Sequence, residues 1–170
     1  EQGKGDIWDS GKIESDASQW IAYQGKTLKR NAPYYWKVKI DTNKGTTDWS
    51  TPAFWTTGLF NEADWQGQWI GLDKAAPGDS ETQWSRLAAR YLRKEFALKK
   101  EVKRATVHIA GMGLYELFIN GQRIGNQVLA PAPTDYRKTI LYNTYDVTSL
   151  LQTENAIGVT LGNGRFYTMR

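Results

Sequence analysis

The sequence predicts an all-β protein made of two β-sandwich domains, and three observations support this class. The 170 residues include 8 Trp, 9 Tyr and 16 Gly, a composition that favours short strands joined by turns over long helices. Apolar and polar side chains alternate with period two in several segments, as in strands with one buried face. Two of these segments are separated by Asn120-Gly121, a dipeptide typical of a tight hairpin.

Composition also excludes several kinds of site. The chain has no cysteine, which excludes disulfides, cysteine-based zinc sites and a thiol nucleophile. His108 is the only histidine, and its place in an alternating segment indicates a packed or surface residue rather than a general base. There is no run of about 18 apolar residues, so we expect no membrane span. Residues 1–20 lack an apolar signal-peptide core, so we expect the chain to begin as mature or internal sequence.

The net charge of +4 does not indicate a nucleic-acid partner. Basic residues are densest from Arg86 to Arg104, but Glu95 and Glu101 interrupt this stretch. Its charges alternate with apolar residues, which is typical of a solvated strand face rather than of a phosphate-binding stripe. The compartment stays open, with a periplasmic or secreted location as the favoured expectation.

Residues 1–60 predict the first sandwich domain. A strand is expected from Tyr34 to Ile40, a turn at Asn43-Lys44-Gly45 and a second extended run from Trp49 to Thr57. Shorter extended pieces are expected between Ile13 and Tyr23. Because two or three strands cannot cover both faces of a sandwich, we expect this domain to be incomplete.

Residues 61–82 predict a linker, and residues 83–170 a second sandwich of the jelly-roll type. Asp146 can start a short helical turn by accepting hydrogen bonds from the amides that follow it. The final strand ends close to Arg170, so this domain is also expected to be incomplete. Its predicted strands cover Tyr91–Leu98, Ala105–Ile109, Leu114–Ile119, Gln122–Ile124, Lys138–Tyr145 and Ile157–Leu161.

No group of residues predicts catalysis. Glycoside hydrolysis usually requires two carboxyl groups roughly 5 to 10 Å apart, and many of the 18 acidic residues accompany turn or cap signals. Gly111-Met112-Gly113 and Gly162-Asn163-Gly164 are too short for a dinucleotide fingerprint and indicate turns.

Some residues could instead contact a sugar, because aromatic rings stack on sugar faces and amides bond hydroxyl groups. The candidates are Trp84, Asn120, Tyr136 and Asn163, with Tyr142 and Phe166 as further aromatic residues. For each of these residues, a role in packing or in turn formation is the favoured alternative.

Three motifs stand out in the first half of the chain: Trp8-Asp9-Ser10-Gly11-Lys12, Tyr34-Tyr35-Trp36-Lys37-Val38 and Asp48-Trp49-Ser50-Thr51-Pro52 with Phe54. In this order they resemble the fibronectin type III-like domain of bacterial α-L-rhamnosidases. The spacing of Leu28 and Tyr34 is similar to that fold's tyrosine corner.

The second half carries a longer series of motifs: Leu114-Tyr115-Glu116-Leu117-Phe118-Ile119-Asn120-Gly121, Leu129-Ala130-Pro131, Thr134-Asp135-Tyr136, Tyr142-Asn143-Thr144-Tyr145-Asp146-Val147-Thr148 and Asn155-Ala156-Ile157-Gly158. They resemble the amino-terminal β-sandwich domain of the same family, in the expected order. Near the end, the family usually has Gly-Trp-Tyr where this chain has Gly164-Arg165-Phe166-Tyr167.

The resemblance implies a parent enzyme that hydrolyses terminal α-L-rhamnose with inversion, using acidic residues of an (α/α)₆ barrel. The acid-rich motif of that barrel does not occur in residues 1–170, so no catalytic residue is carried over and the segment alone is expected to be inactive. The expected partners are the barrel on the same polypeptide and, through the parent enzyme, carbohydrate. An autonomous carbohydrate-binding module and an adhesion protein are the alternatives.

The resemblance also bears on cofactors. Some members bind rhamnose through calcium with a related sandwich, using an acidic residue and an Asn just before the hairpin Gly. Here that pair is Ile119-Asn120, which lacks the carboxylate that would supply a hard oxygen ligand. No cofactor is therefore expected, and the missing carboxylate puts calcium binding in doubt. We expect Asn120 to be an ordinary turn residue.

Overall fold

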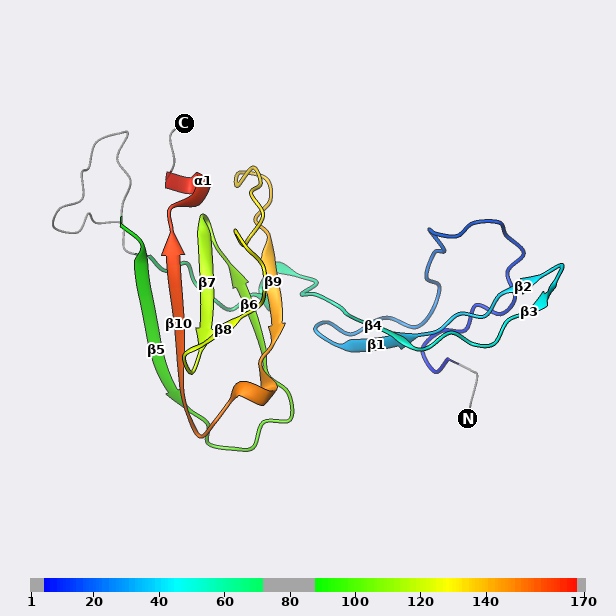
Figure 1. Cartoon of the computed structure of the whole chain (residues 1–170), viewed down its shortest axis with the longest axis horizontal. Helices are drawn as coiled ribbons and strands as arrows, with labels where there is room; N and C mark the ends of the chain where they lie inside the picture. Colours follow the sequence, from blue (N-terminus) through cyan, green and yellow to red (C-terminus); the bar gives the residue numbers. More distant parts are fainter. Residues whose placement is uncertain (1–4, 72–87, 168–170) are drawn as a thin grey trace. The chain divides into compact units, whose positions relative to one another are not determined.

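The computed structural model describes residues 5–71 and 88–167, which divide into two compact units between Gln68 and Trp69 (Figure 1). Within these ranges the chain forms antiparallel strands β1 to β10, two short 3₁₀ turns and one four-residue helix. The predicted all-β class is confirmed. No described helix is long and apolar enough to cross a bilayer.

The first unit is organised around a long hairpin. Tyr34 lies opposite Trp55 and Tyr35 opposite Phe54, so aromatic residues pair across the hairpin on both of its sides. Val38 and Ser50 continue the ladder through a backbone hydrogen bond of 2.8 Å. The strands are β1 (Pro33–Trp36), β2 (Asp41–Thr42), β3 (Gly45–Thr46) and β4 (Ala53–Thr56).

Regular strand geometry is interrupted in the middle of this hairpin. Four residues lie between Trp36 and Asp41 on one arm, whereas six lie between their partners, Thr46 and Ala53, on the other. The longer arm contains Pro52, which cannot donate to a ladder. The predicted turn is present at the tip, where Gly45 has a φ of 121°. The strand expected from Tyr34 to Ile40 therefore ends at Trp36 and continues as irregular extended chain.

A tyrosine corner fixes the loop that enters β1. The amide of Lys29 donates to the Tyr34 hydroxyl at 2.7 Å, one residue after the predicted Leu28. The buried hydroxyl of Thr57 donates to the Lys29 carbonyl at 2.6 Å and accepts from the Ala32 amide at 3.0 Å. The bond between the Tyr34 hydroxyl and the upstream backbone is typical of immunoglobulin-like sandwiches.

The chain leaves the hairpin through a 3₁₀ turn, η1 (Glu62–Asp64), held by the Asp64 carboxylate. This carboxylate is buried, accepts from the amides of Phe60 (3.1 Å) and Asn61 (3.2 Å), and pairs with Arg30. Residues 13–23, where short extended pieces were expected, contain no assigned strand. They are anchored instead by an edge contact between Tyr23 and Trp8 at 5.1 Å.

The second unit contains two facing sheets (Figure 1). The four-stranded sheet has the order β5-β10-β7-β8, and β6 pairs with β9 in the other. The strands are β5 (Arg90–Ala97), β6 (Thr106–Ala110), β7 (Leu114–Ile119), β8 (Gln122–Ile124), β9 (Tyr142–Asp146) and β10 (Glu154–Gly162).

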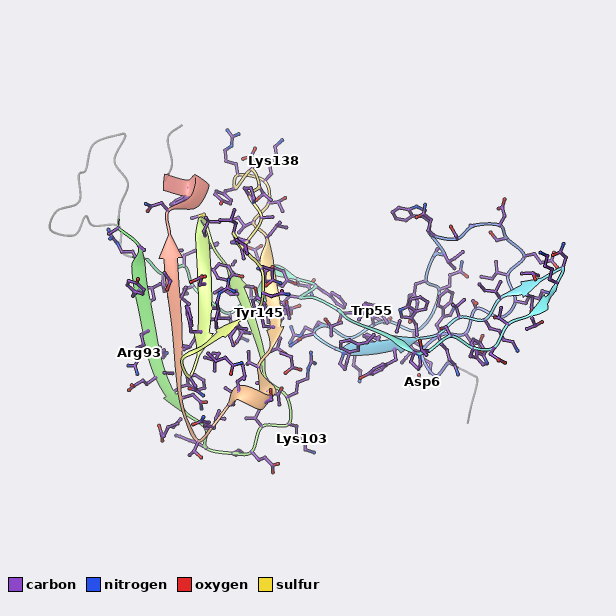
Figure 2. The ribbon with its side chains drawn as sticks, viewed as in Figure 1. Asp6, Trp55, Arg93, Lys103, Lys138 and Tyr145 are labelled. Carbon is purple, nitrogen blue, oxygen red and sulfur yellow. The ribbon has the colours of Figure 1, made fainter. Side chains whose placement is uncertain are left out.

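Alternate residues of β7 build the core between these sheets. Leu117 is fully buried, and Tyr115 is nearly so. Apolar side chains from both sheets pack against them, as in a sandwich: Val107, Ile109, Ile124, Tyr145, Ile157, Val159 and Leu161. Tyr145, labelled in Figure 2, also donates its hydroxyl to Gln127 at 3.1 Å.

Local signals in this unit were predicted well. Asn120 and Gly121 have φ values of 51° and 82°, which confirms the hairpin between β7 and β8. Asp146 accepts from the Thr148 amide at 2.9 Å and starts the 3₁₀ turn η2 (Thr148–Leu150), as expected. The strand expected from Lys138, however, begins only at Tyr142, because the amides of Lys138 and Thr139 both bond to the Asp135 carbonyl and form a turn.

Candidate functional site

The predicted sugar contacts do not form one site. Trp84 lies outside the described residues. Asn120 lies in the β7–β8 turn, whereas Asn163 follows the far end of β10, which runs antiparallel to β7. Seven residues of extended chain, from Ala156 beside Asn120 to Asn163, correspond to about 23 Å. One sugar ring cannot bridge the two asparagines.

Asn120 is engaged by the protein itself. Its Nδ2 donates to the Leu150 carbonyl at 2.9 Å and to Asn155 Oδ1 at 3.0 Å, and its Oδ1 accepts from the Ala156 amide at 2.8 Å. Asn155 is buried and bonds both ways to the backbone of Gln152. The side chain of Asn120 therefore uses both of its N–H groups to hold the hairpin to β10, and a sugar hydroxyl would have to displace these bonds.

The described residues do not support a metal site at this hairpin. They include no group of three or more His, Asp or Glu side chains arranged to hold an ion. Ile119, at the position where a carboxylate would serve calcium, is buried in the core.

Tyr136 and Phe166 come together at the other end of the second unit. Their ring centroids are 6.2 Å apart in an edge arrangement, which joins the loop before β9 to the helix α1 (Gly164–Tyr167). Asn163 immediately precedes this helix. Beside Tyr136, Arg137 pairs with both oxygens of Asp135, at 3.0 and 3.1 Å. Aromatic, amide and charged groups are thus gathered at this end.

The two glycine-rich turns are packed against one another beneath this group. A Cβ atom on Gly113, whose φ is 135°, would lie 2.7 Å from the Gly162 carbonyl oxygen. A Cβ atom on Gly164 would lie equally close to Gly113. The glycines therefore permit a close backbone approach, which accounts for both motifs without a bound nucleotide.

Several described carboxylates already have structural partners. Glu116 pairs with Arg123 at 3.1 Å on the four-stranded sheet. Hydrogen bonds from Thr148 lower the pKa of Asp146, and a hydrogen bond from Thr46 lowers that of Asp41. A general acid in a glycosidase needs the opposite shift, because its carboxyl group must stay protonated near neutral pH.

His108 has an environment of its own on β6. Its Nδ1 lies 3.0 Å from Thr144 Oγ1, its ring contacts Tyr142 edge-on at 5.8 Å, and its Nε2 is buried without a hydrogen-bond partner in the described structure. Burial, and then the charge of Arg104, lower its pKa. Packing therefore favours the neutral form of the His108 ring.

Two family models match the chain. The model described as "Rha78A-like, N-terminal immunoglobulin domain" covers residues 1–61, and the "Alpha-L-rhamnosidase N-terminal domain" covers residues 100–170. The fibronectin type III-like domain expected from the sequence shares its sandwich architecture with the immunoglobulin domain.

Proteins with similar sequences are named α-L-rhamnosidases. An α-L-rhamnosidase of Formosa agariphila is 40% identical over 95% of this chain, and one of Alteromonas sp. is 35% identical over 94%. The chain spans about a fifth of these relatives, 19% and 18% of their lengths.

Solved structures agree. The α-L-rhamnosidase from Dictyoglumus thermophilum matches with a TM-score of 0.84 and 42% identity, over 96% of this chain and 19% of that one. The enzyme from Aspergillus terreus matches with a TM-score of 0.73 and 31% identity, over 91% and 18%. The chain thus matches two amino-terminal domains of α-L-rhamnosidases in order, the immunoglobulin-like domain and the N-terminal domain.

Proposed function

We propose that these residues are the non-catalytic part of an enzyme that removes terminal α-L-rhamnose from glycans or glycosides. The observation that carries the proposal is the coverage of the relatives: the match extends over 95% of this chain but only 19% of a protein named α-L-rhamnosidase. The remaining four fifths of such a protein would supply the reaction centre, and the two sandwiches would brace it.

The proposed chemistry is inverting hydrolysis. It requires an acid and a base roughly 6.5–9.5 Å apart, with a water molecule on the far face of the sugar. Three carboxylates of this chain have structural roles instead. Glu116 and Asp135 form ion pairs, and Asp146 has a lowered pKa because of its hydrogen bonds to Thr148. We therefore assign the acid and base to the parent protein outside residues 1–170.

The experiment compares the 170-residue chain with the natural protein that contains it, using an aryl α-L-rhamnoside. We expect product release only from the longer protein, with β-rhamnose as the first anomer seen by NMR. Release by the purified chain in proportion to its concentration would contradict the assignment, and α-rhamnose as the first anomer would contradict inversion.

A second candidate function is sugar binding at the end of the second unit that carries Tyr136, Phe166 and Asn163. The ring contact between Tyr136 and Phe166 favours it, because it brings two predicted aromatic contacts together. Titration with rhamnose, with and without calcium, tests it by chemical shifts of these residues. Tyr136→Ala should abolish the shifts, whereas Tyr91→Ala, at an exposed ring on β5, should not. Unchanged shifts at millimolar rhamnose would remove this candidate.

A further inference from the structure

One side of the β1–β4 hairpin in the first unit presents aromatic and basic residues together. Alternation in β1 places Tyr35 on this side and Tyr34 and Trp36 on the other, and Lys37 and Lys39 follow in the extended chain beyond the end of β1. On the second arm, Phe54 packs beside Tyr35, and the ring of Trp49 lies under both Lys37 and Lys39. We call Tyr35, Lys37, Lys39, Trp49 and Phe54 the aromatic–lysine face. Trp55, which stacks on Tyr34 on the opposite side, is labelled in Figure 2 and shows where the hairpin lies.

Two rings of this face form an exposed apolar platform. Tyr35 is 71% exposed and Phe54 is 57% exposed, although their centroids are only 5.2 Å apart. Tyr34, by contrast, uses its hydroxyl in the tyrosine corner and is half-buried. Scattered exposed apolar residues are ordinary, but two adjacent rings paired across strands form a contiguous apolar surface, here with the ring planes inclined by 44°.

The lysines of this face are held in place by an aromatic ring. The Nζ atoms of Lys37 and Lys39 lie 4.7 and 6.0 Å from the centroid of Trp49, within the range of cation–π attraction. Neither ammonium group forms an ion pair with a described residue. The carboxylate of Asp41 pairs with Lys12 at 3.7 Å, and the charge of Lys39 also acts on it and helps to lower its pKa. The ammonium group of Lys37, and in part that of Lys39, is therefore available to a ligand.

We propose that the aromatic–lysine face binds an acidic glycan. Sugar rings would stack on Tyr35 and Phe54, and carboxylate or sulfate groups would pair with Lys37 and Lys39. From Tyr35 to Lys39 the extended backbone spans about 13 Å, so an extended glycan can reach both parts of the face at once. The positive charges of Lys37 and Lys39 favour an anionic ligand. The aromatic rings favour a ligand that contains sugar rings over an anion that has no apolar surface. The proposal is independent of the activity of the parent enzyme.

The test is affinity electrophoresis and calorimetry of the 170-residue chain with polygalacturonate as the probe. Dextran serves as a neutral glycan and inorganic polyphosphate as a polyanion without sugar. We expect retardation by polygalacturonate that weakens as salt is raised, because salt screens exposed charges. We expect no retardation by dextran and weaker retardation by polyphosphate.

Variants separate the two parts of the face. Tyr35→Ala should weaken polygalacturonate binding about threefold to tenfold. Lys37→Gln and Lys39→Gln should each weaken it about twofold to fivefold. The matched controls are Lys44→Gln, at the exposed hairpin tip, and Tyr91→Ala, at an exposed ring of the other unit. The lysine variants keep the test valid should Tyr35→Ala not fold.

Three outcomes overturn the proposal. The first is no retardation by polygalacturonate at low salt, as expected if the face instead contacts another protein domain. The second is equal weakening by the control variants. The third is equally tight binding of polyphosphate with no effect of Tyr35→Ala, which would identify a general polyanion surface.

Discussion

Asn120 and Asn155 join two strands that are far apart in the sequence, through a hydrogen bond of 3.0 Å between Asn120 Nδ2 and Asn155 Oδ1. Asn120 directly follows the last residue of β7, and Asn155 is the second residue of β10. The Ala156 amide completes the link by donating to Asn120 Oδ1. A hairpin at the edge of the sheet is thus tied to the strand beside it.

Asn120→Gly should separate the contribution of the turn's backbone conformation to stability from that of the Asn120 side-chain hydrogen bonds. Glycine tolerates the φ of 51°, so the turn survives while three hydrogen bonds are lost. We expect a loss of about 2 kcal/mol in the free energy of unfolding, because partly buried partners are left unsatisfied. Asn120→Ala should cost about 1 kcal/mol more through backbone strain. Hydrogen exchange of the β7 and β10 amides measures both, and a glycine variant as stable as the original chain would contradict the role given to Asn120.

Tyr34→Phe should destabilise the first unit by about 1 kcal/mol, because it removes the acceptor of the Lys29 amide. The matched control is Tyr35→Phe, one residue away on the exposed side of the hairpin, which should change stability by less than about 0.5 kcal/mol. Urea unfolding of both variants makes the comparison. Equal effects would show that the tyrosine corner does not stabilise this unit.

Asp64→Ala should destabilise the first unit by about 2 kcal/mol, since it removes a buried acceptor shared by two amides and Arg30. Asp16→Ala, at an exposed residue, is the control and should be close to neutral. Thermal unfolding, with the tryptophan signal of the first unit, gives the difference. An Asp64→Ala variant that melts with the control would mean that η1 forms without its carboxylate.

Acidification should destabilise the second unit through His108. Its pKa is lowered in the folded state, by burial first and by Arg104 second, so the unfolded chain binds a proton more readily. Stability should therefore fall as pH drops below about 6.5, the ordinary value for histidine. No other histidine titrates in this window.

His108→Gln should flatten the dependence of unfolding free energy on pH between about 7.5 and 5. Arg104→Gln should reduce the slope without removing it, because burial of the ring remains. Urea unfolding at several pH values provides the measurement. A slope that persists unchanged in the His108→Gln variant would assign it to other groups.

Local features were predictable because neighbours in the sequence produce them. Asn120 and Gly121 both accept positive φ, and Asp146 lies two residues before the Thr148 amide that it caps. The start of β9 was not predictable: alternation from Lys138 onward favours a strand, but the Asp135 carbonyl captures two amides and holds a turn there. Asn120 raised the same difficulty, since its partners lie 30 to 36 residues away.

The sequence by itself determined the all-β class, the principal hairpins and the resemblance to α-L-rhamnosidases, because residue types and motif order carry this information without any distance. The sugar-contact assignments of Tyr136 and Asn163 remain predictions. Only the tertiary structure decided which side chains have partners: it separated Asn120 from Asn163 by the length of β10, placed Tyr136 beside Phe166, left Tyr35 and Phe54 exposed, and placed two lysines over the ring of Trp49. Such contacts join strands distant in the chain, and their energies depend on distance and burial, which sequence spacing does not specify.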